Sequence, residues 1–224
     1  EPIFAVLHAD ERVAGITVGL RYRCRLSARP RHVYFPSLPR LRAGVDLAEA
    51  LEQLRDELAQ LSGRGVLIAG GAGFLGYYLV QAPLHWNRTH PSEPPIRLTV
   101  LDNFSRGIPA WLTACAADTN VRLLKHDITQ PLPADLDDHA YLIHAASIAS
   151  PTYYPQHPIE TMDANVNGLR HLLNHCLRQQ QRSKPVEGVL FYSSSEIYGD
   201  PTPEHLPTPE TYRGNVSCTG PRAC

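Results

Sequence analysis

Four glycines follow a short apolar run and could hold the pyrophosphate of a dinucleotide. The run is Val66–Ala69, the segment after the turn is Phe74–Val80, and the glycines are Gly70, Gly71, Gly73 and Gly76. Strand, glycine turn and helix in this order form a dinucleotide-binding fingerprint. Glycines let the backbone turn tightly and approach the anion, and the helix N-terminus offers free N–H groups and a partial positive charge. We therefore expect a dinucleotide here; the alternative is an ordinary strand-to-helix turn.

An acidic residue, Asp102, follows the next apolar run, Arg97–Leu101. A carboxylate at the end of a second strand can accept hydrogen bonds from the ribose hydroxyls of NAD, and it repels the 2′-phosphate of NADP. The usual offset from the glycines is about 20 residues, and a polar, proline-rich insertion at His85–Pro95 explains the longer one here. The sequence favours NAD, although Arg106 could serve a 2′-phosphate and Asp102 could be a plain turn residue.

Polar or small residues also follow the third and fourth apolar runs. Asp127 and Ile128 come after the third run, where the acid could bond the adenine amino group or simply form a turn. The fourth run ends in small residues, which could admit the nicotinamide half or fill a packed core. They are Ala145, Ala146 and Ser147.

Hydroxyls and a carboxylate gather after the fifth apolar run, Gly188–Tyr192. They are Ser193, Ser194, Ser195 and Glu196. Such a group suits a polar substrate with several hydroxyls, and Glu196 could act there as a general acid or base. The alternative for Glu196 is an acid that caps a helix.

These groups meet only if the apolar runs are parallel strands whose carboxyl ends share one edge. From Val66 onward, strands alternate with helices, including a long one at Ile159–Gln181. Alternation of this kind predicts an α/β fold, a Rossmann-type doubly wound parallel sheet with helices on both faces. Right-handed crossovers favour the order 3-2-1-4-5. The five strands are expected at 66–69, 97–101, 121–125, 140–145 and 188–192.

Residues 1–62 are expected to form a small β-β-α extension of unknown role, and residues 63–224 the NAD-binding domain. Strand-like stretches lie at Ile3–His8 and Val13–Leu26. Leucines recur every three or four residues in Asp46–Leu61, which predicts a helix. Its leucine stripe indicates core packing; a partner site is the alternative. After Asp200 the chain is rich in proline and threonine and reads as loop.

Composition excludes several classes of function. The formal net charge is -1, so nothing indicates a nucleic acid or an anionic membrane as partner. No apolar run approaches the roughly 20 residues of a membrane span. The five cysteines are spread out and form no Cys-x-x-Cys pair, which favours free thiols in a reducing, cytoplasmic compartment. The eleven histidines are scattered without a His-Glu-x-x-His motif, so no metal site is expected.

Together these motifs resemble the extended short-chain dehydrogenase/reductase family, the NAD-dependent sugar-nucleotide epimerases and dehydratases. The resemblance covers Val66–Cys224 and not residues 1–62. Gly-Gly-Ala-Gly-Phe-Leu-Gly at 70–76 resembles the family's glycine motif, with Ala69 where threonine is usual. Asp102-Asn103-Phe104 and His126-Asp127-Ile128 resemble its next two strand ends.

Three further runs resemble the family's UDP-glucuronate decarboxylases. They are His144–Pro151, Ser194–Pro201 and Gly220–Cys224. Serine before Glu196 is typical of decarboxylases, where 4,6-dehydratases have aspartate and 4-epimerases usually lack the glutamate. Asp163, in contrast, resembles a general epimerase, since decarboxylases tend to have lysine there. The substrate therefore stays open among these sugar nucleotides.

The resemblance implies NAD as cofactor, a UDP-sugar as substrate, and a set of contact residues. It assigns cofactor binding to Gly70, Gly73, Phe74, Leu75, Gly76, Asp102, Asn103, Phe104, Asp127, Ile128, Ala145, Ala146, Ser147 and Ala164. It assigns catalysis to Ser194, Ser195 and Glu196. In the implied reaction, a hydride passes from sugar C4 to NAD, the 4-ketone lets the C5 carboxylate leave as carbon dioxide, and the hydride returns.

The family's Tyr-x-x-x-Lys pair has no counterpart in these 224 residues. In relatives it follows directly after Gly-Pro-Arg-Ala-Cys, the tyrosine acting as base at the C4 hydroxyl. We expect these residues by themselves to bind NAD weakly and to show no turnover. A non-catalytic NAD-binding module is the alternative to an enzyme. Relatives usually dimerise through the helix that corresponds to 159–181, so a homodimer is expected by analogy.

Overall fold

The computed structural model describes residues 54–150 and 152–217, with Leu51, Thr219 and the backbone of three short strands at 4–7, 19–22 and 31–34. The rest of the predicted extension, including most of Asp46–Leu61, lies outside the described residues. Within the described part the extension contributes β1 (Phe4–Leu7), β2 (Gly19–Tyr22), β3 (Arg31–Tyr34) and α2 (Arg55–Ala59). Strands β2 and β3 pair antiparallel.

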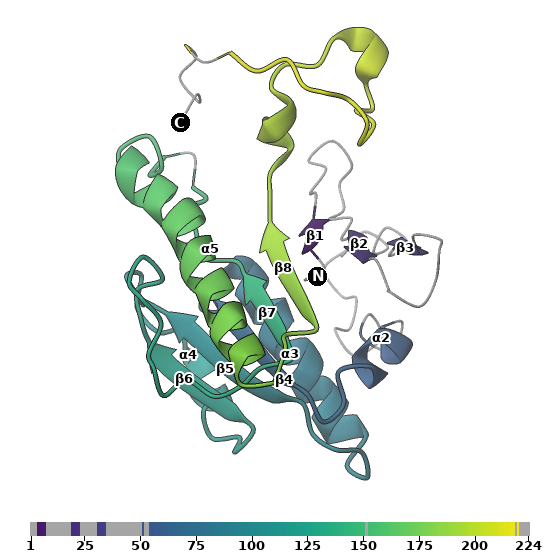
Figure 1. Cartoon of the computed structure of the whole chain (residues 1–224), viewed down its shortest axis with the longest axis vertical. Coiled ribbons are helices and arrows are strands. Elements are labelled where there is room, and N and C mark those ends of the chain that lie inside the picture. Colours follow the sequence, from purple (N-terminus) through teal and green to yellow (C-terminus); the bar gives the residue numbers. More distant parts are fainter. Residues whose placement is uncertain are drawn as a thin grey trace.

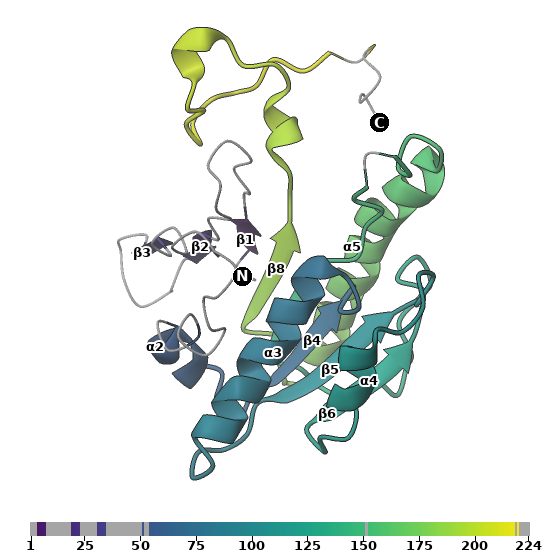
Figure 2. The ribbon, with the colours of Figure 1, turned by 180° about the vertical axis from the view of Figure 1, so that it is seen from behind.

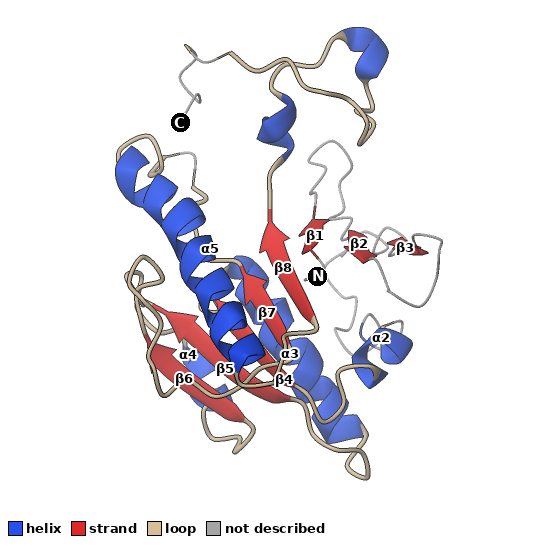
Figure 3. Cartoon of the chain, viewed as in Figure 1, coloured by secondary structure: helices blue, strands red, loops and turns tan. Residues whose placement is uncertain are grey.

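The main sheet is parallel, and it contains the five predicted strands in the predicted order. Its strands run β1-β8-β7-β4-β5-β6 (Figure 3). Read from β6, the order is 3-2-1-4-5, and β1 pairs with the outer edge of β8. The strands beyond β1 are β4 (Gly65–Ala69), β5 (Arg97–Asp102), β6 (Val121–Lys125), β7 (Tyr141–His144) and β8 (Gly188–Tyr192).

Helices cover both faces of the sheet. Helices α3 (Phe74–Thr89) and α4 (Ala110–Cys115) lie on one face, and α5 (Pro158–Gln181) lies on the other (Figures 1 and 2). Alternate residues of β4 therefore enter two cores: Val66 and Ile68 pack with α3, whereas Leu67 packs with Leu172 of α5. All five residues of β4 are buried, which is why the strand reads as an unbroken apolar run.

Helix α2 packs on the α3 side of the sheet. Leu58 is buried in the same core as Val66, and Leu54 and Leu61 pack against that core. The described end of the leucine stripe thus faces the Rossmann core. The chain then enters β4 through Gly63, whose N–H donates to the carbonyl of Pro94 at 2.9 Å.

Helix α3 is longer than the sequence predicts. The insertion expected at His85–Pro95 is helical as far as Thr89, and Pro83 lies inside the helix. The helix continues because Val80, Leu84 and Trp86 all bury against the sheet. Asn87 closes the remaining loop: its amide donates to the Ile96 carbonyl at 2.9 Å and accepts from the Ile96 N–H at 2.8 Å.

Across the described residues, none of the helices combines the length and apolar character that a bilayer crossing requires.

Candidate cofactor-binding and active site

The carboxyl ends of β4, β5, β7 and β8 lie along one edge of the sheet (Figure 1). The predicted site segments follow these four ends or that of β6, apart from Ala164 on α5, so the topology brings most of the predicted cofactor residues to the same edge. Parallel sheets of this type bind ligands at that edge, in the crevice where the strand order reverses. Here the reversal falls between β4 and β7.

The glycine turn packs directly on the end of β7. Gly70 has φ of +86°, and a Cβ built there would lie 2.5 Å from Ala145 C and Ala146 N. A Cβ on Gly76 would overlap the carbonyl of Gly71, so the first turn of α3 sits tightly on the glycine turn. A Cβ on Gly73 would meet only the Gly70 carbonyl oxygen, at 3.4 Å. Close packing therefore requires glycine at positions 70 and 76, whereas Gly73 leaves room beside the helix N-terminus.

The N-terminus of α3 is free to receive an anion. Gly73 is its N-cap, none of the described side chains caps the helix, and the first turn carries no acidic residue. The first N–H groups of a helix have no partner inside the helix, and together with the helix dipole they favour a bound anion. Phe74, Leu75 and Gly76 supply those N–H groups. The turn and the helix thus fit a pyrophosphate, as the sequence predicts.

Asp102 ties the glycine turn to the end of β5. One carboxylate oxygen accepts from the Ala72 N–H at 3.0 Å, and the other accepts from the Phe104 N–H at 2.8 Å. Each oxygen keeps a further lone pair for a ribose hydroxyl. Phe104 has φ of +53°, and Asn103 accepts from the Ser105 N–H at 3.0 Å. These bonds shape the turn that follows the acid.

The next strand end places Asp127 and Ile128 differently. The exposed Asp127 carboxylate accepts from the backbone N–H and the hydroxyl of Thr129, at 3.0 and 2.8 Å. It therefore holds its own turn, and an adenine contact stays a prediction. Ile128 is buried in the core on the α5 side.

The end of β7 is joined to α5. The Ala145 N–H donates to the Ala69 carbonyl at 2.8 Å, and His144 Nε2 lies 3.0 Å from the Ala164 carbonyl oxygen. Burial lowers the pKa of His144, while its bond to that carbonyl acts in the opposite direction. Ala146 and Ala164 both pack partly against the α5-side core. Two predicted contact segments, 145–147 and Ala164, are thereby brought together.

The serine-rich segment follows β8 at the same edge. A short 3-10 helix covers Ser195–Tyr198, and the chain beyond it rises away from the sheet (Figure 1). The side chains of Ser195 and Glu196 lie outside the described residues, and Ser194 is exposed. We call residues 199–217 the arm. The backbone N–H of Asn215 donates to the Tyr198 carbonyl at 2.8 Å and so ties the arm to the end of the 3-10 helix. The catalytic roles of the three residues therefore stay predictions.

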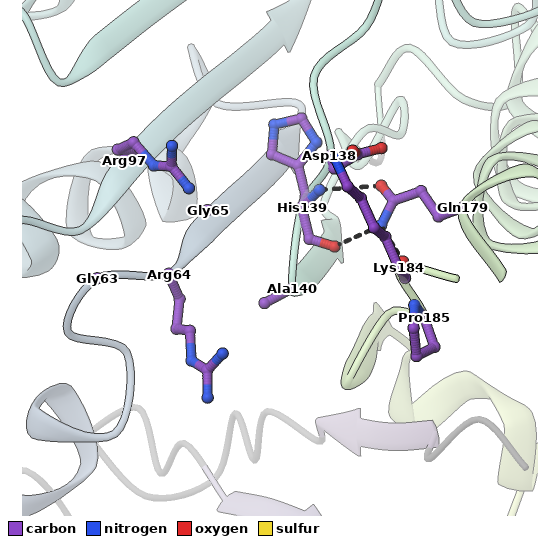
Figure 4. Close-up of a pocket in the computed structure, with 10 residues that line it drawn as sticks. All are labelled: Gly63, Arg64, Gly65, Arg97, Asp138, His139, Ala140, Gln179, Lys184 and Pro185. Carbon is purple, nitrogen blue, oxygen red and sulfur yellow. Dashed lines mark hydrogen bonds and ion pairs between the residues drawn. The ribbon is translucent and has the colours of Figure 1, made fainter. Parts of the chain in front are cut away.

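A small cavity of about 160 Å³ opens at the opposite end of the sheet, as Figure 4 shows. Arg64, Arg97 and Ala140, at the amino ends of β4, β5 and β7, contribute to its wall. It is therefore not part of the candidate site. No group of three or more metal-ligating side chains gathers within the described part of the chain.

Comparison with known families shows which family this chain belongs to. The profile of the NAD dependent epimerase/dehydratase family matches residues 66–220. The chain belongs to this family. The match begins in β4 and takes in the glycine turn, Asp102 and the serine-rich segment; of the runs that resemble the family, only Gly220–Cys224 extends beyond it.

Curated proteins similar to this chain include UDP-glucuronic acid decarboxylases. UDP-glucuronic acid decarboxylase 5 of Arabidopsis thaliana is 33% identical over 171 residues, which are 76% of this chain and 45% of that protein. UDP-glucuronic acid decarboxylase 1 of Xenopus tropicalis is 34% identical over 167 residues, 75% of this chain and 35% of that protein. The chain thus spans less than half the length of these relatives.

Solved structures of family members share the fold. An NAD-dependent NDP-hexosamine 5,6-dehydratase, TunA, is 30% identical with a TM-score of 0.51, over 71% of this chain and 45% of that one. A UDP-N-acetylglucosamine 4-epimerase from Methanobrevibacter ruminantium M1 is 25% identical with a TM-score of 0.55, over 72% and 46%.

NAD is the cofactor of this epimerase/dehydratase family, and the described edge fits it. The uncapped α3 N-terminus and the space beside Gly73 suit the pyrophosphate, and the Asp102 carboxylate suits ribose hydroxyls.

Sequence reasoning missed Gly168 of α5, whose Cβ would lie 3.0 Å from His144 Nε2. A glycine inside a long helix was the available signal, because it is unfavourable there without a packing reason.

Proposed function

We propose that this chain is the cofactor-binding portion of a carboxy-lyase that converts UDP-glucuronate to UDP-xylose. The observation that carries the proposal is the run Ser194–Pro201, which follows β8 at the cofactor edge and resembles the decarboxylases. Curated relatives named UDP-glucuronic acid decarboxylase support it, at 32 to 34% identity.

The proposed chemistry explains why a decarboxylase needs a redox cofactor. NAD, when bound, supplies a reversible hydride acceptor at sugar C4. A ketone at C4 lies β to the carboxylate on C5, so the electrons of the breaking C–C bond can move toward the C4 oxygen as carbon dioxide leaves. The glycine turn and Asp102 hold the cofactor, and Ser194 forms a hydrogen bond with the C4 oxygen. Glu196 acts as the general acid or base for the proton that C5 gains when carbon dioxide leaves.

Incubation of the full-length protein with UDP-glucuronate tests this proposal, with UDP-xylose detected by mass. We expect Glu196→Gln to lower turnover about 100-fold or more with little change in NAD affinity. Glu204→Gln, which alters an exposed acid in the arm, is the matched control and should retain activity. The absence of UDP-xylose from the wild-type reaction would refute the decarboxylase assignment.

A second candidate is a sugar-nucleotide 4-epimerase or 4,6-dehydratase. Asp163 favours it, since a decarboxylase tends to have lysine at that place, and the similar solved structures include an epimerase and a dehydratase. UDP-glucose and UDP-N-acetylglucosamine should be offered to the same protein. An epimeric product, or a product lighter by one water, would favour this candidate over the decarboxylase.

We also propose that these 224 residues by themselves bind NAD weakly and do not turn over, because they contain no Tyr-x-x-x-Lys. The base for the C4 hydroxyl is then missing. Steady release of carbon dioxide from UDP-glucuronate by this polypeptide would contradict the proposal. We propose that the full-length protein is a homodimer in the cytoplasm; exposed apolar residues on α5 support the dimer.

A further inference from the structure

Two predicted cofactor-contact segments, Ala145–Ser147 and Ala164, meet at one buried side chain, His144. It is the last residue of β7, directly before Ala145–Ser147, and it is 2% exposed. Its Nε2 reaches the carbonyl of Ala164 on α5. On β8, Phe191 packs edge-to-face against the ring, with centroids 5.3 Å apart. His144 therefore touches β8 and α5 while it ends β7.

The direction of the His144 hydrogen bond follows from chemistry. A carbonyl oxygen can only accept, so Nε2 carries the proton and donates it to Ala164. Burial lowers the pKa of the imidazole, which keeps the ring neutral. The Ala164 oxygen has two lone pairs and can also accept the i+4 bond of its own helix. The contact thus anchors α5 to the sheet without breaking the helix.

Gly168 allows α5 to come close enough for this bond. A Cβ at Gly168 would lie 3.0 Å from His144 Nε2 and 3.1 Å from Cγ1 and Cγ2 of Ile128. Glycine in a helix interior is about 1 kcal/mol less favourable than alanine, so close packing is the physical reason for it here. One turn of α5 therefore rests on both His144 and Ile128.

We propose that His144 is a positioning residue for the NAD site. Its bond to Ala164, which Gly168 permits, fixes the distance between α5 and the carboxyl end of β7. That distance sets where Ala145–Ser147, Ala164 and Ile128 stand around the cofactor. The proposal rests on NAD binding by this family and not on which sugar nucleotide is the substrate.

The test compares NAD affinity with stability in the full-length protein, without any sugar nucleotide. His144→Leu removes the donor and keeps apolar volume, whereas His144→Gln restores an N–H at similar reach. We expect His144→Leu to weaken NAD binding about tenfold, as loss of one well-placed hydrogen bond would, and His144→Gln to recover most of it. Titration calorimetry gives the Kd, and urea unfolding gives the stability.

His175→Leu is the matched control, because His175 is also buried, lies on α5, and makes no hydrogen bond through Nε2 to any described residue. It should leave NAD binding unchanged, whatever change in stability urea unfolding shows. The proposal is overturned if His144→Leu binds NAD as the wild type does, if glutamine rescues nothing, or if His175→Leu weakens NAD equally.

A measurement on the wild-type protein tests the same bond without any variant. The ¹⁵N-imidazole spectrum should show His144 as the neutral Nε2–H tautomer at pH 7. A proton on Nδ1 in its place would remove the donor to Ala164 and overturn the proposal even if the variants failed to fold.

Discussion

At the scale of single residues, Asp102 combines a structural and a selective task. Its carboxylate accepts from Ala72 and Phe104, and its negative charge is predicted to face the adenosine ribose. We predict that Asp102→Asn lowers the preference for NAD over NADP about tenfold or more, because repulsion of a 2′-phosphate is lost. Calorimetric Kd values for both cofactors measure it. Asp118→Asn, which changes a turn acid before β6, should leave the ratio unchanged; an unchanged ratio in Asp102→Asn would contradict the prediction.

The buried His139 makes the free energy of unfolding depend on pH. Desolvation, and then repulsion from His175, lowers its pKa to about 4, while Asp137 and Asp138 act in the opposite direction. An unfolded histidine binds its proton near pH 6.5, so the unfolded state binds more protons and stability falls as the pH drops from 6.5 toward 4. The full effect is about 3 kcal/mol. Urea unfolding across this range should show a shallower loss for His139→Gln, and an identical profile would refute the assignment.

At the scale of elements, the turn between β4 and α3 depends on contact more than on backbone angle. Gly70 and Gly107 both have positive φ, of +86° and +83°. A Cβ on Gly70 would strike the backbone of Ala145 and Ala146, whereas one on Gly107 meets nothing within 4 Å. We predict that Gly107→Ala costs about 1 kcal/mol and Gly70→Ala at least about 2 kcal/mol more. Equal losses in denaturant unfolding would show that the close approach is unimportant.

Helix α2 gives a second prediction at this scale, because it buries Leu58 in the core shared by α3 and β4. Leu58→Ala should cost about 2 to 4 kcal/mol through lost burial and the cavity left behind. Leu177→Ala on α5, where the side chain is 56% exposed, should change stability by less than about 0.5 kcal/mol. Similar unfolding midpoints for the two variants would mean that α2 is not part of this core.

The elements also show what sequence can and cannot predict. The strand β4 was predictable because both its faces are buried, which leaves an unbroken apolar run. Asp102 and Gly70 could be placed together because parallel strands end at one edge. The sequence did not predict that α3 runs into the insertion as far as Thr89, where burial of Leu84 and Trp86 outweighs the helix-breaking tendency of Pro83.

The bond from His144 to Ala164 could not be predicted, because it joins residues 20 positions apart through packing between a strand and a helix. The sequence identified both neighbourhoods as cofactor contacts but held no pattern for their mutual distance. Gly168 signals close packing inside a helix, but the structure is needed to show that its neighbour is His144 of β7.

At the scale of the whole molecule, the two predicted halves of the site come from different parts of the chain. The turn after β4, the ends of β5 and β7, and α5 supply the cofactor half. The segment after β8 supplies the predicted substrate half and continues into the arm above the sheet (Figure 2). Because the cofactor half is packed by its own core, NAD binding and turnover can be examined as separate properties.

The outer face of α5 carries the remaining prediction for the whole molecule. Ile159, Met162 and Val166 recur along one side of the helix and are 61%, 50% and 54% exposed. Exposed apolar residues gathered along one side of a helix favour an interface. We predict that the full-length protein is a dimer and that Val166→Lys shifts it toward monomer at micromolar concentration, since a buried unpaired charge is costly. Asn174→Lys adds the same charge to an exposed polar position of α5 and should leave the dimer intact. Analytical ultracentrifugation distinguishes these outcomes, and a monomeric wild-type protein would show that these apolar residues serve another contact.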